Sequence, residues 1–287
     1  MMSDKNSKPQ DNVEEPRSPY EKAKGLVPLV FRVFIRTRLM QLGNRLTQLD
    51  RPLLANEYLR GAGIEIGALH APLPVNRLTR VKYVDRLPVQ GLRELYPELN
   101  SQEIVQTDIL DDGQYLATIQ DSSQNFVIAN HFLEHCPNPL EALKNIHRVL
   151  CDGGVFFLAL PDKRFTFDVD RPVTSFDHLL RDFEEGPEWS KRGHYEEWVN
   201  LVSKPAEQDA EAQIQDLMQK EVWIHFHVWT QVEMFELLAN ARKTLGLNFE
   251  IECFLKNDAE CIFVLRKIAS PADGLTTQQA TDKLNTR

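Results

Sequence analysis

Apolar and polar residues alternate in blocks through the middle of the chain, and these blocks predict short strands separated by helices. Five apolar runs predict strands at residues 63–66, 81–84, 103–106, 125–129 and 155–160. Between the last two, apolar residues recur every three or four positions over 139–150, which predicts an amphipathic helix that ends at Gly153-Gly154. Strands alternating with helices predict right-handed crossovers and a mostly parallel, doubly wound α/β sheet.

The pattern changes after Pro161. Residues 162–222 are charged, aromatic and helix-like, with little strand signal, so we expect a helical insertion or lid. A helix is predicted again at 230–244, followed by strands at 248–254 and 260–266 that would close the sheet as an antiparallel hairpin. The whole sheet would then have seven strands.

The two ends of the chain differ from this central pattern. Residues 1–20 are polar and Pro-rich and are expected to be a disordered tail, as is a flexible tail at 269–287. Residues 21–58 predict an N-terminal helical extension that precedes the main domain at 59–268. Its basic amphipathic part, 21–49, is too short and too charged to span a bilayer, so it caps the domain or lies on a membrane surface.

Composition excludes some classes of function. The chain has 287 residues, is 42% hydrophobic and carries a net charge of −9, which argues against a dedicated nucleic-acid binder because such a protein needs a basic face. Its four cysteines contain no Cys-x-x-Cys and predict a reducing compartment. The polar first residues show no secretory signal, so we expect a cytoplasmic protein.

Polar residues stand at the ends of the predicted parallel strands. Glu65 lies near the end of the first strand, before a turn at Gly67, while Asp85 ends the second. Asp108 follows the predicted third strand and Asn130 ends the fourth. Carboxyl ends of parallel strands meet at one edge, where nucleoside cofactors bind, and an acid about twenty positions after the glycine turn suits a ribose diol. Asp108 and the residue after it could contact the amine and ring of an adenine.

This set resembles the class I S-adenosylmethionine-dependent methyltransferases. The matching residues are Glu65-Ile-Gly67-Ala68, Asp85, Thr107-Asp108-Ile109, and the succession Glu134-His135, Pro139, Arg148-Val149-Leu150, Gly153-Gly154 and Pro161. The resemblance is strong over about 60–162. It implies a Rossmann-like methyltransferase fold and S-adenosylmethionine as cofactor. The implied cofactor-binding residues are Glu65, Gly67, Ala68, Asp85, Asp108, Ile109, Asn130 and His131.

One departure from the family concerns the first motif, which usually carries two or three glycines. Here Ala68, Leu69 and His70 follow the single Gly67, so the methionine end of the cofactor must be held differently. His70 could help to hold it, or the loop could be rebuilt around prolines.

Two other readings of the same region are disfavoured. Residues 131–135 spell H-x-x-E-H, a zinc-protease pattern, but they follow a strand directly, and Pro137 and Pro139 would cut any helix short. An NAD-dependent dehydrogenase would need G-x-G-x-x-G after the first strand, and that motif is absent.

Two segments offer candidate catalytic residues. The segment that leaves the fifth strand is either a solvated charged loop or an acceptor-binding loop, and its polar residues are Asp162, Lys163, Arg164, Asp168, Arg171 and His178. We take Asp162, His178, His225 and His227 as catalytic candidates. In an extended chain His225 and His227 would point to the same side, as metal ligands, as acid/base partners or as part of a polar layer. No residues are assigned to a metal site, and His194 is expected to be exposed.

The resemblance predicts an enzyme that methylates an oxygen or nitrogen of a small or glycan-like polar acceptor, in surface polysaccharide biosynthesis. Its partners would be a small-molecule or saccharide substrate and, through residues 21–49, a membrane surface, with no nucleic acid. The alternative is a catalytically inactive interaction module in a biosynthetic complex. The single-glycine motif favours that alternative, whereas the intact acids at the strand ends oppose it.

Overall fold

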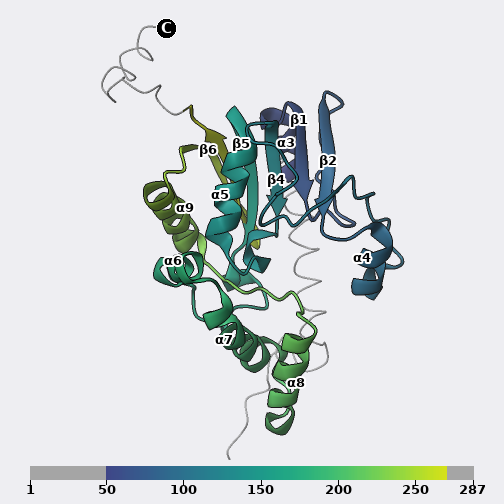
Figure 1. Ribbon diagram of the computed structural model, residues 1–287, viewed down its shortest axis with the longest axis vertical. Helices are drawn as coiled ribbons and strands as arrows, with labels where there is room; N and C mark the ends of the chain where they lie inside the picture. The colour runs from purple at the N-terminus through teal and green to yellow at the C-terminus, as the bar shows by residue number, and fades with distance from the viewer. Residues whose placement is uncertain (1–49, 270–287) are drawn as a thin grey trace, which may run out of the picture.

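A seven-stranded mixed sheet forms the centre of the structure, a computed structural model that describes residues 50–269 (Figure 1). The strands are β1 (Gly61–Ile66), β2 (Thr79–Asp85), β3 (Ile109–Leu110), β4 (Gln124–Asn130), β5 (Leu150–Pro161), β6 (Phe249–Asn257) and β7 (Glu260–Lys267). Their order in the sheet is β3-β2-β1-β4-β5-β7-β6. Strands β1 to β5 are all parallel to one another. Strand β7 is antiparallel to both of its neighbours, β5 and β6. The predicted α/β fold and its closing antiparallel hairpin are confirmed.

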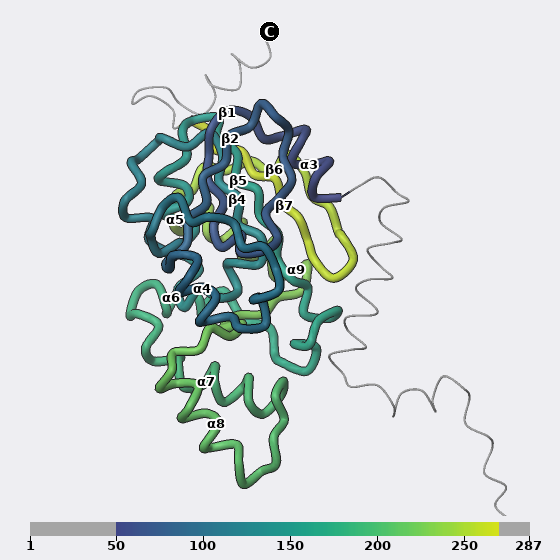
Figure 2. Tube along the Cα trace, turned by 90° about the vertical axis from the view of Figure 1, so that its right-hand side faces the viewer, coloured from purple at the N-terminus to yellow at the C-terminus, as the bar shows by residue number. Residues whose placement is uncertain are grey.

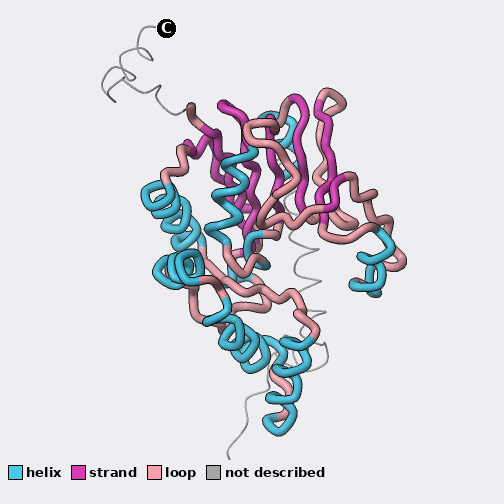
Figure 3. The backbone as a smooth tube through the Cα atoms, in the orientation of Figure 1, coloured by secondary structure: helices cyan, strands magenta, loops and turns pink. Residues whose placement is uncertain are grey.

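Helices flank the sheet and extend beyond one end of it. They are α3 (Arg51–Tyr58), α4 (Val89–Leu95), α5 (Pro139–Val149), α6 (Phe176–Glu185), α7 (Glu188–Trp198), α8 (Glu207–Gln219) and α9 (Gln231–Leu245). In Figure 3, α7 and α8 lie away from the strands, and Figure 2 shows the same separation from the side. Helices α6 to α8 form the insertion expected after β5. Among residues 50–269, no helix is both long and apolar enough to cross a membrane.

Side-chain alternation buries both faces of the sheet. In β4, Val127 and Ala129 face a core that includes α5 and α9, while Phe126 and Ile128 face a second core that includes α3. Successive residues of a strand point to opposite faces, so a strand covered on both sides reads as a continuous apolar run.

Local capping explains where the two main helices begin. Asn138 accepts a hydrogen bond from the N–H of Glu141 and starts α5, and Thr230 with Glu233 forms a capping box at the start of α9. These are the residue types that satisfy the free N–H groups of a first turn.

Two sequence expectations about elements are wrong. Residues 103–106 form no strand, because the short β3 begins later, at Ile109. The glycines at 153 and 154 do not end the helix: α5 stops at Val149, and both glycines lie inside β5. The predictions for residues 1–20, 21–49 and 270–287 fall outside the described residues, and only α3 represents the expected N-terminal extension.

Candidate active site

The carboxyl ends of β1, β2 and β4 meet at one edge of the sheet, which we call the cofactor edge. Ile66 of β1 is in register with Val84 of β2 and with Ala129 of β4. The next residue along each of these three strands is Gly67 after β1, Asp85 in β2 and Asn130 in β4. Because β1 has β2 on one side and β4 on the other, this is the topological switch point where open α/β sheets bind ligands.

The turn after β1 is open above Gly67. Gly67 has a φ of +64°, and a Cβ added there would meet no atom within 4 Å. Leu69 also has a left-handed φ of +49°, a conformation that is uncommon for residues with a side chain and that clusters at functional sites. Among the described residues no helix begins between β1 and β2, so the turn presents backbone rather than a helix N-terminus.

Glu65 holds this turn in shape. Its buried carboxylate accepts hydrogen bonds from the N–H of Leu73 at 3.0 and 3.1 Å. Burial raises the pKa of Glu65 to about 7, although the Leu73 N–H and the Arg51 guanidinium oppose the rise. Glu65 therefore positions the loop that follows β1, and direct contact with a cofactor stays a prediction.

Asp85 lies half-buried at the end of β2. One of its oxygens accepts a hydrogen bond of 2.8 Å from the N–H of Arg86. Burial raises the pKa of Asp85, and the N–H groups of Arg86 and Leu87 act in the opposite direction. Its place at the cofactor edge, next to Gly67, suits an acceptor for a ribose diol.

Asp108 lies before its strand, which corrects the prediction that it follows one. It is level with Tyr83 of β2, where it donates its N–H to the Tyr83 carbonyl and accepts the Tyr83 N–H on its carboxylate, both at 2.9 Å. The residue beyond β3 is Asp111, whose carboxylate accepts the Thr118 N–H and hydroxyl at 2.7 Å. An adenine contact by Asp108 and Ile109 remains a prediction.

Buried polar atoms without partners lie just beyond the end of β4. The side-chain oxygen of Asn130 and both carboxylate oxygens of Glu134 are buried, with no hydrogen-bond partner among the described residues, whereas the Asn130 amide nitrogen faces the Glu65 carboxylate. Glu134 is 0% exposed, and the nearest ion-pair partner of its carboxylate is Nδ1 of His131, at 3.6 Å. Buried polar groups nearly always have hydrogen bonds, so unpaired atoms on two nearby residues indicate a place that a ligand completes.

His131 connects the end of β4 with the start of β7, two strands away in the sheet. It has a left-handed φ of +51°, and its Nε2 lies 2.7 Å from the carboxylate of Glu260, which also pairs with Arg51. Burial acts to raise the pKa of Glu260, but the hydrogen bonds with His131 and Arg51 hold this pKa well below its usual range. No sequence signal linked these residues, since 209 positions separate Arg51 from Glu260.

The letters H-x-x-E-H do not form a zinc-protease site. His131 is bonded to Glu260, whereas Nδ1 of His135 lies 2.9 Å from the carbonyl oxygen of Ile224. Only residues 133–135 are helical, in a single 3-10 turn, so the two histidines do not share a helix face.

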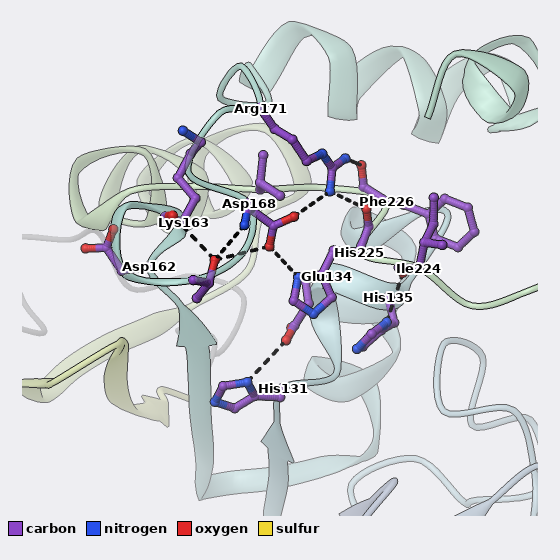
Figure 4. Close-up of polar contacts among 12 residues, drawn as sticks. His131, Glu134, His135, Asp162, Lys163, Asp168, Arg171, Ile224, His225 and Phe226 are labelled. Carbon is purple, nitrogen blue, oxygen red and sulfur yellow. Dashed lines mark hydrogen bonds and ion pairs between the residues drawn. The ribbon is translucent and has the colours of Figure 1, made fainter. Parts of the chain in front are cut away.

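A second polar set, which we call the His225 set, consists of His225, Asp168 and Arg171 (Figure 4). Nδ1 of His225 lies 2.7 Å from Asp168, and Arg171 donates to Asp168 at 2.9 Å and to the carbonyls of His225 and Phe226 at 2.7 and 3.1 Å. Burial acts to raise the pKa of Asp168, but the hydrogen bonds with His225 and Arg171 hold this pKa below its usual value. An ionised Asp168 can only accept, so Nδ1 of His225 is the donor in this hydrogen bond.

Glu134 connects the His225 set with the cofactor edge. Its carbonyl accepts the N–H of Phe226 at 2.8 Å, and ligand atoms of Glu134, His135 and His225 lie within 4.8 Å of one another. Figure 4 shows Glu134 between His131 and His225. The ring of His225 thus lies beside the buried carboxylate of Glu134.

Comparison with known protein families agrees with this geometry. Residues 59–210, more than half of the chain, match the family model described as a methyltransferase domain. The chain belongs to this methyltransferase family. No curated protein matches the chain in a sequence search.

A structure search also finds methyltransferases, at low sequence identity and low structural similarity. A S-adenosylmethionine-dependent methyltransferase from Methanosarcina mazei is 15% identical with a TM-score of 0.42, and the match covers 77% of this chain and 100% of that one. One from Thermotoga maritima, described as a possible histamine N-methyltransferase, is 16% identical with a TM-score of 0.40, covering 83% and 94%. The CurJ carbon methyltransferase is 10% identical with a TM-score of 0.42, and the match covers 74% of this chain and half of that one. None of these similarities bears on the acceptor.

S-adenosylmethionine is the cofactor of this methyltransferase family. The residues at the cofactor edge fit such a molecule: the turn at Gly67 is open, Asp85 offers an acid for the ribose, and Asn130 and Glu134 have unpaired polar atoms. How each of these residues contacts the cofactor stays a prediction.

The four predicted catalytic residues lie in three different places. His225 belongs to the His225 set, whereas Asp162 is buried and paired with the Arg164 side chain at 2.6 and 2.9 Å. His178 and His227 lie together in one cluster, whereas His225 lies with Glu134 and His135, and the catalytic roles of all four residues stay predictions. His194 belongs to the same cluster and is buried, which corrects its expected exposure.

Sequence reasoning missed the role of two residues in the His225 set. Asp168 and Arg171 were noted only as part of a charged segment, which could equally have been a solvated loop. Their spacing of three residues is compatible with an ion pair, but nothing in the segment indicates that both side chains are buried.

Proposed function

We propose that this methyltransferase methylates a hydroxyl group of a small, glycan-like polar acceptor, with His225 as the general base. The observation that carries the proposal is the pairing of His225 with an ionised Asp168, next to the unpaired carboxylate of Glu134. A hydroxyl acceptor needs such a base, because the neutral oxygen becomes a competent nucleophile only as its proton leaves.

Each residue of the His225 set has its own role in the proposed methyl transfer. S-adenosylmethionine supplies a methyl group whose bond to the positive sulfur breaks with both electrons remaining on sulfur. As the acceptor oxygen bonds to the methyl carbon, Nε2 of His225 takes the hydroxyl proton. Asp168 stabilises the resulting imidazolium and fixes the ring orientation, while Arg171 holds Asp168 in place.

Surroundings of His225 favour a saccharide-like acceptor. The ring of Phe167 is 37% exposed, and its centroid lies 4.8 Å from that of His225 and 5.3 Å from that of Trp198. Partly exposed aromatic rings can pack on the apolar face of a sugar. A role in surface polysaccharide biosynthesis, with membrane contact through residues 21–49, extends this proposal from the sequence alone.

The test is a turnover assay with the purified full chain, S-adenosylmethionine and a panel of nucleotide sugars and oligosaccharides, with mass spectrometry of the products. We expect H225Q to lower kcat by about 10²- to 10⁴-fold, the usual contribution of a positioned general base, while its affinity for S-adenosylmethionine stays near wild type. H147Q is the matched control, since His147 lies in the last turn of α5, outside the cofactor edge and the His225 set.

Two results would overturn the proposal. If the enzyme methylated another class of acceptor and no polar hydroxyl compound, the glycan-like acceptor would be rejected. Wild-type turnover by H225Q would reject His225 as the base.

A further inference from the structure

Four potential metal ligands meet in the insertion, in what we call the His-Asp cluster: His178, Asp182, His194 and His227. His178 and Asp182 stand four residues apart on α6 and therefore on one face of that helix. His194 comes from α7, and His227 from the segment that leads into α9. The cluster thus joins three separate segments of the chain.

The distances within the cluster match those between ligands of a tetrahedral zinc ion. Nε2 of His178 lies 3.2 Å from Nε2 of His194 and 3.2 Å from Oδ2 of Asp182, and Nε2 of His227 lies 3.8 Å from the same oxygen. All four ligand atoms lie within 4.8 Å of one another. Metal–ligand bonds of about 2.0–2.2 Å in a tetrahedron separate the ligand atoms by roughly 3.3–3.5 Å.

Hydrogen bonds within the cluster leave buried polar atoms unsatisfied. Oδ2 of Asp182 and Nδ1 of His227 are buried without a hydrogen-bond partner among the described residues, and both side chains are 0% exposed. Nε2 of His227, the nitrogen that faces Asp182, also lies 3.4 Å from the Pro137 carbonyl oxygen. Nε2 of a neutral His178 offers one proton or one lone pair, so it cannot make full hydrogen bonds with both His194 and Asp182. A cation at the centre would accept a lone pair from each residue.

Neighbouring groups hold these residues in orientations that suit a ligand. Ser190 donates its hydroxyl to Oδ1 of Asp182 at 2.8 Å, and Asn138 donates to the Asp182 carbonyl at 3.1 Å. Hydrogen bonds of this kind to a ligating carboxylate are typical of protein metal sites.

We propose that the His-Asp cluster binds one zinc-type divalent transition-metal ion as a structural site. Three imidazoles and one carboxylate fill the four positions of a tetrahedral site, which leaves no open position for chemistry. The ion fastens α6 and α7 to residues 224–229. Because His227 is two residues from His225, the same ion holds in place the segment that carries the proposed base.

The first experiment is metal analysis of the full chain, produced without a polyhistidine tag in medium that contains zinc. We expect about one zinc per chain in the wild type and in H147Q, and a much lower content in H178Q and H194Q. Circular dichroism identifies variants that have not folded. His178 lies at the rim of the cluster with 26% of its side chain exposed, so H178Q is the variant best suited to remain folded.

A second measurement does not depend on removing a ligand. We expect Co²⁺ added to the metal-free chain to give the intense visible bands of a tetrahedral site, and zinc to raise its thermal unfolding temperature. S190A keeps all four ligands but loses the bond to Asp182, and should bind Co²⁺ about 10- to 100-fold more weakly.

Failure to take up Zn²⁺ or Co²⁺ stoichiometrically by a folded wild-type chain would overturn the proposal. Wild-type metal content in a folded H178Q would overturn it as well, because the metal would then be bound elsewhere.

Discussion

The cofactor edge and the His225 set satisfy their polar groups in different ways. At the cofactor edge, Asn130 and Glu134 carry buried polar atoms without partners, and the turns beyond β1 and β4 contain left-handed residues. In the His225 set, Asp168 and Arg171 are paired with each other and with backbone carbonyls. Among the described residues, the cofactor edge thus keeps buried polar atoms without partners, whereas the Asp168–Arg171 pair of the His225 set is completed by folding alone.

Arg171→Met tests the second half of this comparison and should have the largest effect on stability. It leaves the buried carboxylate of Asp168 without its ion-pair partner, so we expect the free energy of unfolding in urea to fall by about 3–5 kcal/mol. The control is Arg181→Met, which removes an exposed pair with Glu185 and should cost under about 1 kcal/mol. Equal effects of the two variants would mean that the His225 set does not depend on its buried ion pair.

Glu65→Gln tests whether burying the ionised Glu65 carboxylate at the cofactor edge lowers the unfolding free energy. Burial raises the pKa of Glu65 from 4.5 to about 7, so between these values the folded chain keeps a proton that the unfolded chain loses. The contribution of Glu65 to stability is full below pH 4.5 and falls as the pH rises to about 7. Relative to wild type, E65Q should therefore gain up to about 3 kcal/mol in unfolding free energy between pH 4.5 and pH 7.5.

The matched control for this pH series is Glu207→Gln at the exposed start of α8, which should keep the pH dependence of the wild type. A constant difference between E65Q and wild type across the series would contradict the pKa assigned to Glu65.

Asp85→Ala separates ligand binding from folding at the cofactor edge. We expect titration calorimetry to show roughly 10- to 100-fold weaker binding of S-adenosylmethionine, since a hydrogen bond to a charged group is worth about 1.5–3 kcal/mol. The unfolding free energy should change by less than about 1 kcal/mol. Asp170→Ala, which removes an exposed pair with Lys204, should bind the cofactor as the wild type does. Unchanged binding in D85A would place the ribose elsewhere.

Gly67→Ala should lower the unfolding free energy by about 1–2 kcal/mol, because it forces a side chain into a left-handed conformation. Gly153→Ala is a matched control, because Gly153 has a φ of +76° and open space around it, but lies in β5 away from the cofactor edge. Both variants should lose similar stability in urea unfolding, and only G67A should bind S-adenosylmethionine more weakly. Equal binding by the two would show that the Gly67 turn does not contact the cofactor.

Local patterns in the sequence were enough to predict the order of strands and helices and the residues at two strand ends. A strand whose two faces are covered is apolar along most of its length, so β4 and β5 are visible as runs. Asp85 and Asn130 follow from where β2 and β4 stop. The short β3 was misplaced because a strand of two residues has no periodicity to read.

Tertiary structure alone decided which polar side chains meet. His225 and His227 have the same local sequence signal, yet one pairs with Asp168 and the other joins the His-Asp cluster. The pairing of Arg51 with Glu260 likewise joins residues from opposite ends of the described chain. Such contacts depend on how helices and loops pack against the sheet, and spacing along the chain carries no record of that packing. The sequence by itself determined the fold and the cofactor edge, whereas packing decided the base and the metal ligands that we propose.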